Sequence, residues 1–152
     1  MARYLFTLRV QKVLELARQE AIRFRHEGIE PEHVALALIR EREGVATAVL
    51  HNLGVNVDQL SERLEAVLAD CASLTSGSST LWFSASTEEV FDLAEADARS
   101  RNHTYVGTEH ILLGICAQRS SVAAQVLANF GVHESIASEV TGRLLGSPAK
   151  RT

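Results

Sequence analysis

The chain has few prolines, cysteines and aromatic residues, and each shortage narrows the class of protein. Only two prolines interrupt 152 residues dominated by aliphatic side chains and alanine, a composition that favours helices over strands. Two cysteines, Cys71 and Cys116, are too few for a disulfide framework and lack zinc-ligand spacing, which fits a reducing cytoplasm. The length suits one compact unit. The composition therefore predicts a single all-α domain.

Concentrated charge and long apolar segments are also missing. The net charge is −4 and the basic residues are scattered, whereas nucleic acids and anionic membranes are bound by concentrated basic surfaces. No apolar run is long enough for a signal peptide or a membrane span. No G-x-x-x-x-G-K-S/T phosphate loop occurs, so we expect no ATP hydrolysis by this chain. We expect a soluble cytoplasmic protein that binds neither nucleic acid nor membranes.

What the chain does contain is an internal repeat, because residues 11–68 align without a gap on residues 88–145 at an offset of 77 positions. The matched positions include His26 with His103, Glu32 with Glu109, His33 with His110, Asn52 with Asn129 and Gly54 with Gly131. So long a period indicates a duplicated small bundle whose two copies complete one core in a monomer. We expect repeat one at about 6–69, a linker at about 70–83, repeat two at about 84–146 and a tail at 147–152.

Each copy is predicted to contain four helices, from apolar residues spaced three and four positions apart. In copy one the helices are expected from near Thr7 to before Gly28, from Glu30-Pro31-Glu32 through Ile39, over Val45–Leu53 and over Val57–Leu68. Proline suits a first helical position, and Gly54 suits a left-handed C-terminal stop. In copy two, Thr108 is expected to be the N-cap of the second helix, and the fourth helix is expected over Glu134–Leu145.

Three segments of this pattern resemble a known family. They are Tyr105 to Gly114 (YVGTEHILLG), Glu41 to Ala46 (EREGVA) and Leu53-Gly54-Val55. They resemble the Clp repeat domain at the N-terminus of Clp unfoldases, most closely its ClpC branch, over about residues 6–146. The resemblance implies an eight-helix pseudo-twofold domain that recruits substrate proteins and adaptors to an ATP-driven unfoldase and its protease, without a cofactor. The chain is then either the isolated domain of a longer unfoldase or a free-standing accessory protein, and both alternatives stay open.

The resemblance also implies a ligand, because ClpC-like domains are similar to receptors for phosphorylated arginine. Glu32 and Glu109 match the glutamates that bind the guanidinium group, and Thr7 and Ser84 lie in the segments whose helix starts receive the phosphate. A carboxylate can accept paired hydrogen bonds from a guanidinium, and exposed N–H groups at a helix start can hold a phosphate. We therefore expect a phosphoarginine site in each copy.

Several residues depart from the family pattern around these positions. Leu5 replaces an arginine near the phosphate, Pro31 replaces the threonine before Glu32, and Glu88 and Glu89 occupy a stretch that is usually basic. Carboxylates facing a phosphate would repel it. The alternative is that both repeated glutamates only stabilise the first turn of a helix through its dipole. The sequence leaves the two interpretations open.

A second surface is implied by relatives that dock adaptor proteins or cyclic peptides in an apolar groove between the copies. The residues expected to line such a groove are Tyr4, Leu5, Val13, Leu81, Trp82 and Phe83. The alternative is that Trp82 and Phe83 only seal the linker onto the core. A third possibility is a structural assembly factor that docks on the Clp machine without reading a substrate mark.

The repeated histidines invite a metal interpretation, but we expect none. His26 and His33, like His103 and His110, are seven residues apart and have no evident third ligand. Neutral imidazoles that donate to neighbouring backbone are the preferred interpretation. Cys116 is expected on the core face of a helix, where a thiol stays protonated and unreactive. With no acid–base constellation in the sequence, we expect no enzyme activity.

Overall fold

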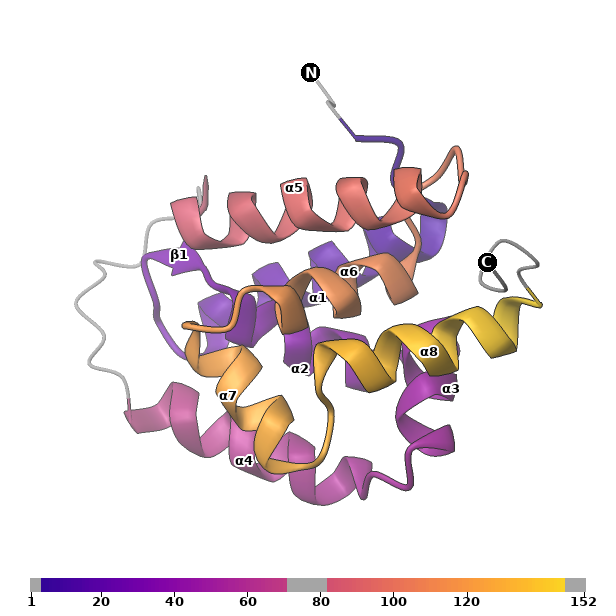
Figure 1. Ribbon diagram of the computed structural model, residues 1–152. Coiled ribbons are helices and arrows are strands. Elements are labelled where there is room, and N and C mark those ends of the chain that lie inside the picture. The colour runs from indigo at the N-terminus through magenta and orange to yellow at the C-terminus, as the bar shows by residue number, and fades with distance from the viewer. Residues whose placement is uncertain (1–3, 71–81, 147–152) are drawn as a thin grey trace.

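The computed structural model describes residues 4–70 and 82–146, which form eight helices and two short strands (Figure 1). Of the linker predicted at about 70–83, residues 71–81, which include Cys71 and Leu81, lie outside the described residues, as does the tail 147–152, whereas Asp70 ends a helix and Trp82–Phe83 form a strand. In chain order the elements are α1 Leu8–Arg23, β1 Gly28–Ile29, α2 Pro31–Glu41, α3 Val45–Asn52, α4 Val57–Asp70, β2 Trp82–Phe83, α5 Ala85–Ser100, α6 Thr108–Ala117, α7 Val122–Asn129 and α8 Glu134–Leu145. The all-α prediction with four helices per copy is confirmed.

The local signals for helix ends act largely as expected. Pro31 is the first residue of α2, and Gly54 and Gly131 follow α3 and α7 with left-handed φ angles of 76° and 86°. One prediction was wrong: Gly107, not Thr108, is the N-cap of α6. Thr108 lies inside the helix, where its hydroxyl accepts a hydrogen bond from the backbone N–H of Ala46 in the other copy, at 3.2 Å.

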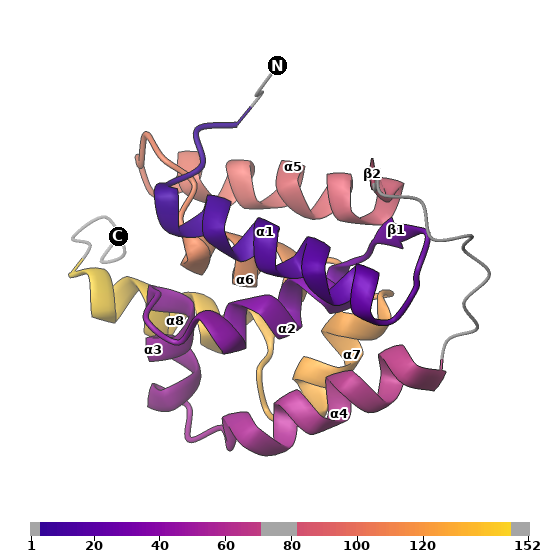
Figure 2. The same ribbon diagram turned by 180° about the vertical axis from the view of Figure 1, so that it is seen from behind.

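Helices α2 and α6 lie at the centre of the molecule. Helices α1 and α5 lie on one side of them, and α3, α4, α7 and α8 lie on the other (Figures 1 and 2). Residues Thr108 to Cys116 of α6 are all buried, and every residue after its first three is apolar, as expected of a helix surrounded by others. Both copies contribute to one hydrophobic core, whose largest fully buried side chains include Leu36, Leu50, Leu60, Leu64, Phe91, Ile111, Leu112 and Leu127.

Helix α5 packs closely on α6 at Gly114. A Cβ atom at Gly114 would lie 2.6 Å from the carbonyl oxygen of Val90 and 3.1 Å from the backbone nitrogen of Ala94. The related position in copy one is Ala37, which is fully buried. In copy two, α5 and α6 can therefore approach each other at this point because Gly114 has no side chain.

The two copies exchange their leading segments, which the sequence did not predict. β1 of copy one pairs in parallel with β2 of copy two, placing Gly28 opposite Trp82 and Ile29 opposite Phe83. In the reciprocal place Phe6 forms a parallel bridge with Val106. These pairs satisfy backbone groups in the extended residues before each helix. As a result, the start of each copy's first helix lies beside the second helix of the other copy.

Among the described residues, no single helix combines the length and apolar character needed to cross a membrane. Taken as a pair, α6 and α7 meet that test by length and composition, although the chain bends by 99° between them.

Candidate functional site

The exchange creates two related corners, which lie at opposite ends of the antiparallel pair α1 and α5 (Figure 2). The first, called the α1 corner, is formed by Thr7, Val106, Gly107 and Glu109. The N–H of Thr7 donates to the carbonyl of Val106 at 3.1 Å, and the N–H of Val106 donates to the carbonyl of Leu5 at 2.8 Å. Thr7 is the N-cap of α1, and its hydroxyl accepts from the N–H of Val10. The start of α1, which is expected to hold a phosphate, is therefore held against the segment that leads into α6, the helix that carries Glu109.

Glu109 is a buried carboxylate with few polar partners. Its side chain folds back over Gly107, where a Cβ atom would lie 2.6 Å from the Glu109 Oε1 atom. The hydroxyl of Tyr105 lies 3.5 Å from Oε2, and the whole residue is 3% exposed. Burial raises the pKa of Glu109, an effect that its own backbone N–H partly offsets. A cation brought to this position would be stabilised by the carboxylate.

A pocket of about 290 Å³ adjoins the α1 corner. Its lining residues are Leu5, Glu95, Ala98, Arg99, His103, Thr104, Tyr105 and Val106. Arg99 is exposed and makes only a long ion pair with Glu95, at 3.5 Å. The sequence interpretation missed Arg99 because the resemblance places the expected arginine at position 5. Arg99 therefore supplies a cation to the pocket that Leu5 also lines.

The second, called the α5 corner, is formed by Ser84, Ile29, Glu30 and Glu32. The N–H of Ser84 donates to the carbonyl of Ile29 at 3.1 Å, as Thr7 does to Val106. Ser84 is the N-cap of α5 and accepts from the N–H of Thr87. Its hydroxyl also donates to the Glu30 carboxylate at 2.9 Å, a contact with no counterpart in copy two because Gly107 has no side chain. A carboxylate of the chain itself thus lies at the start of α5.

Glu32 is placed differently from Glu109. Burial raises the pKa of Glu32, while its own backbone N–H and that of Ala123, at the start of α7, lower it. The related N–H, that of Ala46 in copy one, donates instead to the hydroxyl of Thr108 in copy two. Copy one has Pro31 at that position, which offers no hydroxyl. The Glu32 carboxylate therefore serves a backbone group that a threonine serves in the other copy.

The predicted apolar surface is only partly exposed. Leu5 and Trp82 are 72% and 75% exposed, and Phe83 is half-buried. Val13 was wrongly predicted as an exposed anchor, because it is fully buried in the core. Tyr4 is 8% exposed, and its hydroxyl donates to Asp92 at 2.6 Å.

An aromatic cluster lies beneath this surface, between α1 and α5. The rings of Phe6 and Phe83 both contact Phe91, at centroid distances of 5.2 and 5.0 Å, and Tyr4 stacks on Phe6. Leu8, in the first turn of α1, is 83% exposed and extends the apolar surface. The described part of this surface thus has exposed aliphatic residues at the α1 end, Trp82 at the α5 end and aromatic rings between them.

The histidines form two matching hydrogen-bonded chains. Nδ1 of His33 accepts from the backbone N–H of Glu30 at 2.8 Å, and Nε2 of His33 lies 2.8 Å from Nδ1 of His26. His110 makes the same contacts with the N–H of Gly107 and with His103. The expected direction was wrong, because each buried imidazole accepts from backbone instead of donating to it. Burial and the neighbouring histidine lower the pKa values of both His33 and His110 to about 4, so both are neutral at pH 7.

The claim that the pairs lack a third potential ligand was also wrong for copy two. His103, Glu109 and His110 offer ligand atoms within 4.8 Å of one another. Both nitrogens of His110 already have hydrogen-bond partners, one on backbone and one on His103. These hydrogen bonds account for the close approach of the three side chains, and they fix the start of α6.

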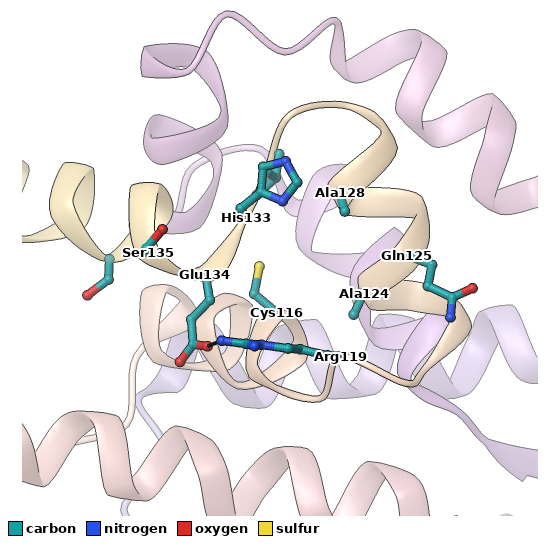
Figure 3. A pocket seen from close by; sticks show the side chains of 10 residues that line it. Cys116, Arg119, Ala124, Gln125, Ala128, His133, Glu134 and Ser135 are labelled. Carbon is teal, nitrogen blue, oxygen red and sulfur yellow. Dashed lines mark ion pairs between the residues drawn. The ribbon is translucent and has the colours of Figure 1, made fainter.

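A groove of about 830 Å³ lies between the end of α6, α7 and the start of α8, and no sequence pattern indicated it (Figure 3). Arg119 and Glu134 form an ion pair across it at 3.5 Å. Cys116 lies at its base, 5% exposed, and burial raises the pKa of its thiol to about 12. The predicted placement of Cys116 in the core is confirmed, and the thiol stays protonated there.

The fold agrees with comparisons to known proteins. The model of the Clp repeat (R) N-terminal domain matches residues 5–130, so the chain belongs to this family. Over 142 residues, 93% of the chain, it is 40% identical to the chaperone protein ClpB of Oceanobacillus iheyensis. It is equally similar to the negative regulator of genetic competence ClpC/MecB of Bacillus subtilis. The chain spans 17% of the length of each of these relatives.

Solved structures of related domains share the fold. The N-terminal domain of Hsp104 from Candida albicans superposes with a TM-score of 0.80 at 18% identity, covering 93% of this chain and 92% of that one. The N-terminal domain of ClpD from Arabidopsis thaliana gives a TM-score of 0.71 at 22% identity, with 93% and 95% covered. The predicted resemblance to the ClpC-like Clp repeat family is confirmed.

Proposed function

We propose that this chain is a non-catalytic recognition domain that binds substrate or adaptor proteins for a ClpC-type unfoldase and reads phosphorylated arginine at the α1 corner. The observation that carries the proposal is the placement of a capped helix start, at Thr7, beside the buried carboxylate of Glu109. A phosphoarginine side chain needs both a guanidinium acceptor and an anion site, within one residue's reach.

The surroundings of the α1 corner support this ligand. Helix α1 has no acidic residue in its first turn, so nothing on that turn repels a phosphate. Arg99 lines the adjoining pocket and can face the phosphoryl oxygens. The burial of Glu109, which its neighbours offset only in part, favours an incoming guanidinium over a neutral group. Dipole stabilisation of α6 by Glu109 would be worth only about 0.3–1 kcal/mol and does not require the carboxylate to be buried.

The test compares an arginine-phosphorylated model protein with the same protein after phosphatase treatment, each immobilised and exposed to the purified domain. The domain is expected to bind the phosphorylated form and to lose that binding in Glu109→Gln, which keeps the size of the side chain. Glu62→Gln, at an exposed residue of α4 that belongs to neither corner, serves as the matched control. Equal binding of both forms by wild type would reject the reading of this mark.

The second candidate is a free-standing Clp-repeat protein that binds a cyclic peptide or docks on the Clp machine through the apolar surface. The observation in its favour is the exposure of Leu5, Leu8 and Trp82 around the aromatic cluster, since large exposed apolar side chains commonly mark docking sites. A related fold, the N-domain of ClpV, has been solved in complex with a VipB peptide.

The two candidates respond differently to surface changes. Trp82→Ala, at the α5 end of the surface, is expected to abolish binding of a cyclic peptide or adaptor while leaving phosphoarginine binding at the α1 corner intact. Binding of a cyclic peptide or adaptor that survives this substitution would reject docking through this surface. Trp82 emission reports such docking directly, because its exposed indole would move out of water.

A further inference from the structure

We propose that the two related corners have diverged, so that the α1 corner is the one phosphoarginine site of the domain and the α5 corner is closed to phosphate by Glu30. This inference rests on the proposed function and deepens it, because it assigns the mark to one copy of a duplicated domain. Three differences between the copies carry it.

The first difference is the ligand already present at the start of α5. The Ser84 hydroxyl donates to Oε1 of Glu30 at 2.9 Å, so a carboxylate lies where a phosphate would need the same hydroxyl. The carbonyl of Ile29 accepts from both the N–H of Ser84 and the hydroxyl of Thr87, at 3.1 and 2.7 Å. A phosphate would have to displace Glu30 and would meet its negative charge.

The second difference concerns the guanidinium acceptor. The N–H of Ala123 donates to the Glu32 carboxylate, because Pro31 offers no hydroxyl to accept from that N–H. The related N–H of Ala46 donates to the hydroxyl of Thr108, so the Glu109 carboxylate does not accept from it. Using Glu32 for a ligand would therefore weaken a contact at the start of α7. Pro31 and Glu30 are adjacent, so two neighbouring substitutions alter both halves of the site.

The third difference is local charge. Arg99 lines the pocket beside the α1 corner, whereas the related position in copy one is Ile22, an exposed apolar residue. Helix α5 carries Glu88 in its first turn, whereas α1 has no acid there. Glu95 lines the same pocket and pairs with Arg99, so the difference that remains is in the first helical turns, where Glu88 disfavours an anion at the α5 corner and α1 carries no acid.

The experiment exchanges the two dipeptides that differ. Free phosphoarginine is titrated by calorimetry into wild type, into Glu30→Gly/Pro31→Thr, which gives copy one the residues of copy two, and into the reciprocal Gly107→Glu/Thr108→Pro. Thermal unfolding of each variant checks that it is folded. The milder Glu30→Gln, which removes the charge and keeps the chain conformation, is titrated in parallel.

The expected numbers of sites per domain are one for wild type, two for Glu30→Gly/Pro31→Thr and none for Gly107→Glu/Thr108→Pro. Glu30→Gln is expected to show measurable binding at the second corner. Two sites in wild type, or an unchanged single site in both folded Glu30 variants, would overturn the closure while leaving the proposed function standing. Absence of binding by wild type would overturn the inference and the reading of phosphoarginine together.

Discussion

Replacement of Gly114 by alanine is expected to destabilise the domain, although local helix propensity predicts the opposite. Gly114 lies within α6, Thr108–Ala117, and alanine is favoured over glycine inside a helix by about 1 kcal/mol. The structure opposes this gain, because the new Cβ would lie 2.6 Å from the carbonyl oxygen of Val90 and 3.1 Å from the nitrogen of Ala94. Both are backbone atoms of α5, which cannot rotate away.

The magnitude follows from these two terms. Forcing a methyl group into a closely packed interface costs about 1–3 kcal/mol, because the helices must separate. After the propensity gain of about 1 kcal/mol is subtracted, the free energy of unfolding should fall by up to about 2 kcal/mol. For a domain of this size that corresponds to a melting temperature lower by up to roughly 8 °C. Separation of α5 from α6 would also move Glu109, so binding at the α1 corner should weaken in the same variant.

Urea unfolding followed by circular dichroism measures the change. The matched control is Ala37→Gly at the related position of copy one, where alanine is already accommodated and fully buried. Ala37→Gly should destabilise by about 1 kcal/mol or somewhat more, from lost propensity and lost packing. An increase in stability of Gly114→Ala by about 1 kcal/mol would refute the steric reasoning, because it would show that α5 and α6 separate without cost.

Three further predictions follow from buried groups. His33 and His110, with pKa values near 4, bind fewer protons in the folded than in the unfolded state between pH 6.5 and 4. Their contribution to stability should therefore fall on acidification through that window, by up to about 3 kcal/mol per histidine, and their NMR signals should not titrate above pH 5. Arg101→Met removes a guanidinium whose side chain is 2% exposed, with its ion pair to Asp97 at 3.0 Å and its hydrogen bond to the Ser138 hydroxyl at 2.7 Å, so unfolding should need about 2–4 kcal/mol less, measured with urea. In a Cys71→Ser background, Cys116 should react with a thiol reagent only at the rate of unfolding, and rapid labelling of the folded domain would show that the thiol is accessible.

The repeat and the helix-ending residues were readable from sequence because they depend on local chemistry. Glycine at positions 54 and 131 and proline at position 31 act within one turn of chain, and the offset of 77 positions is a property of the sequence alone. The exchange of leading segments was not readable, because Phe6 pairs with Val106 across 100 positions and two short extended residues carry no periodicity.

The candidate site was predicted residue by residue but not as two pairs. The resemblance indicated Thr7, Ser84, Glu32 and Glu109, while only the fold shows that each helix start is bonded to the segment that leads into the other copy's second helix. The repeat alignment places Glu30 opposite Gly107, but only the structure shows that the Glu30 carboxylate accepts a hydrogen bond from Ser84. Val13 was misplaced because a helix starting at residue 8 turns it inward, onto the core.

The central claim is recognition of phosphoarginine at the α1 corner, and amide NMR of the labelled domain during titration with free phosphoarginine tests it most directly. The account predicts saturable shifts confined to the amides around Thr7 to Val10 and Gly107 to Glu109, with the amides around Ser84 to Thr87 unmoved. Shifts of equal size at both corners would contradict the divergence of the copies. Unchanged amides at both corners in millimolar ligand would contradict the claim that this domain reads the mark.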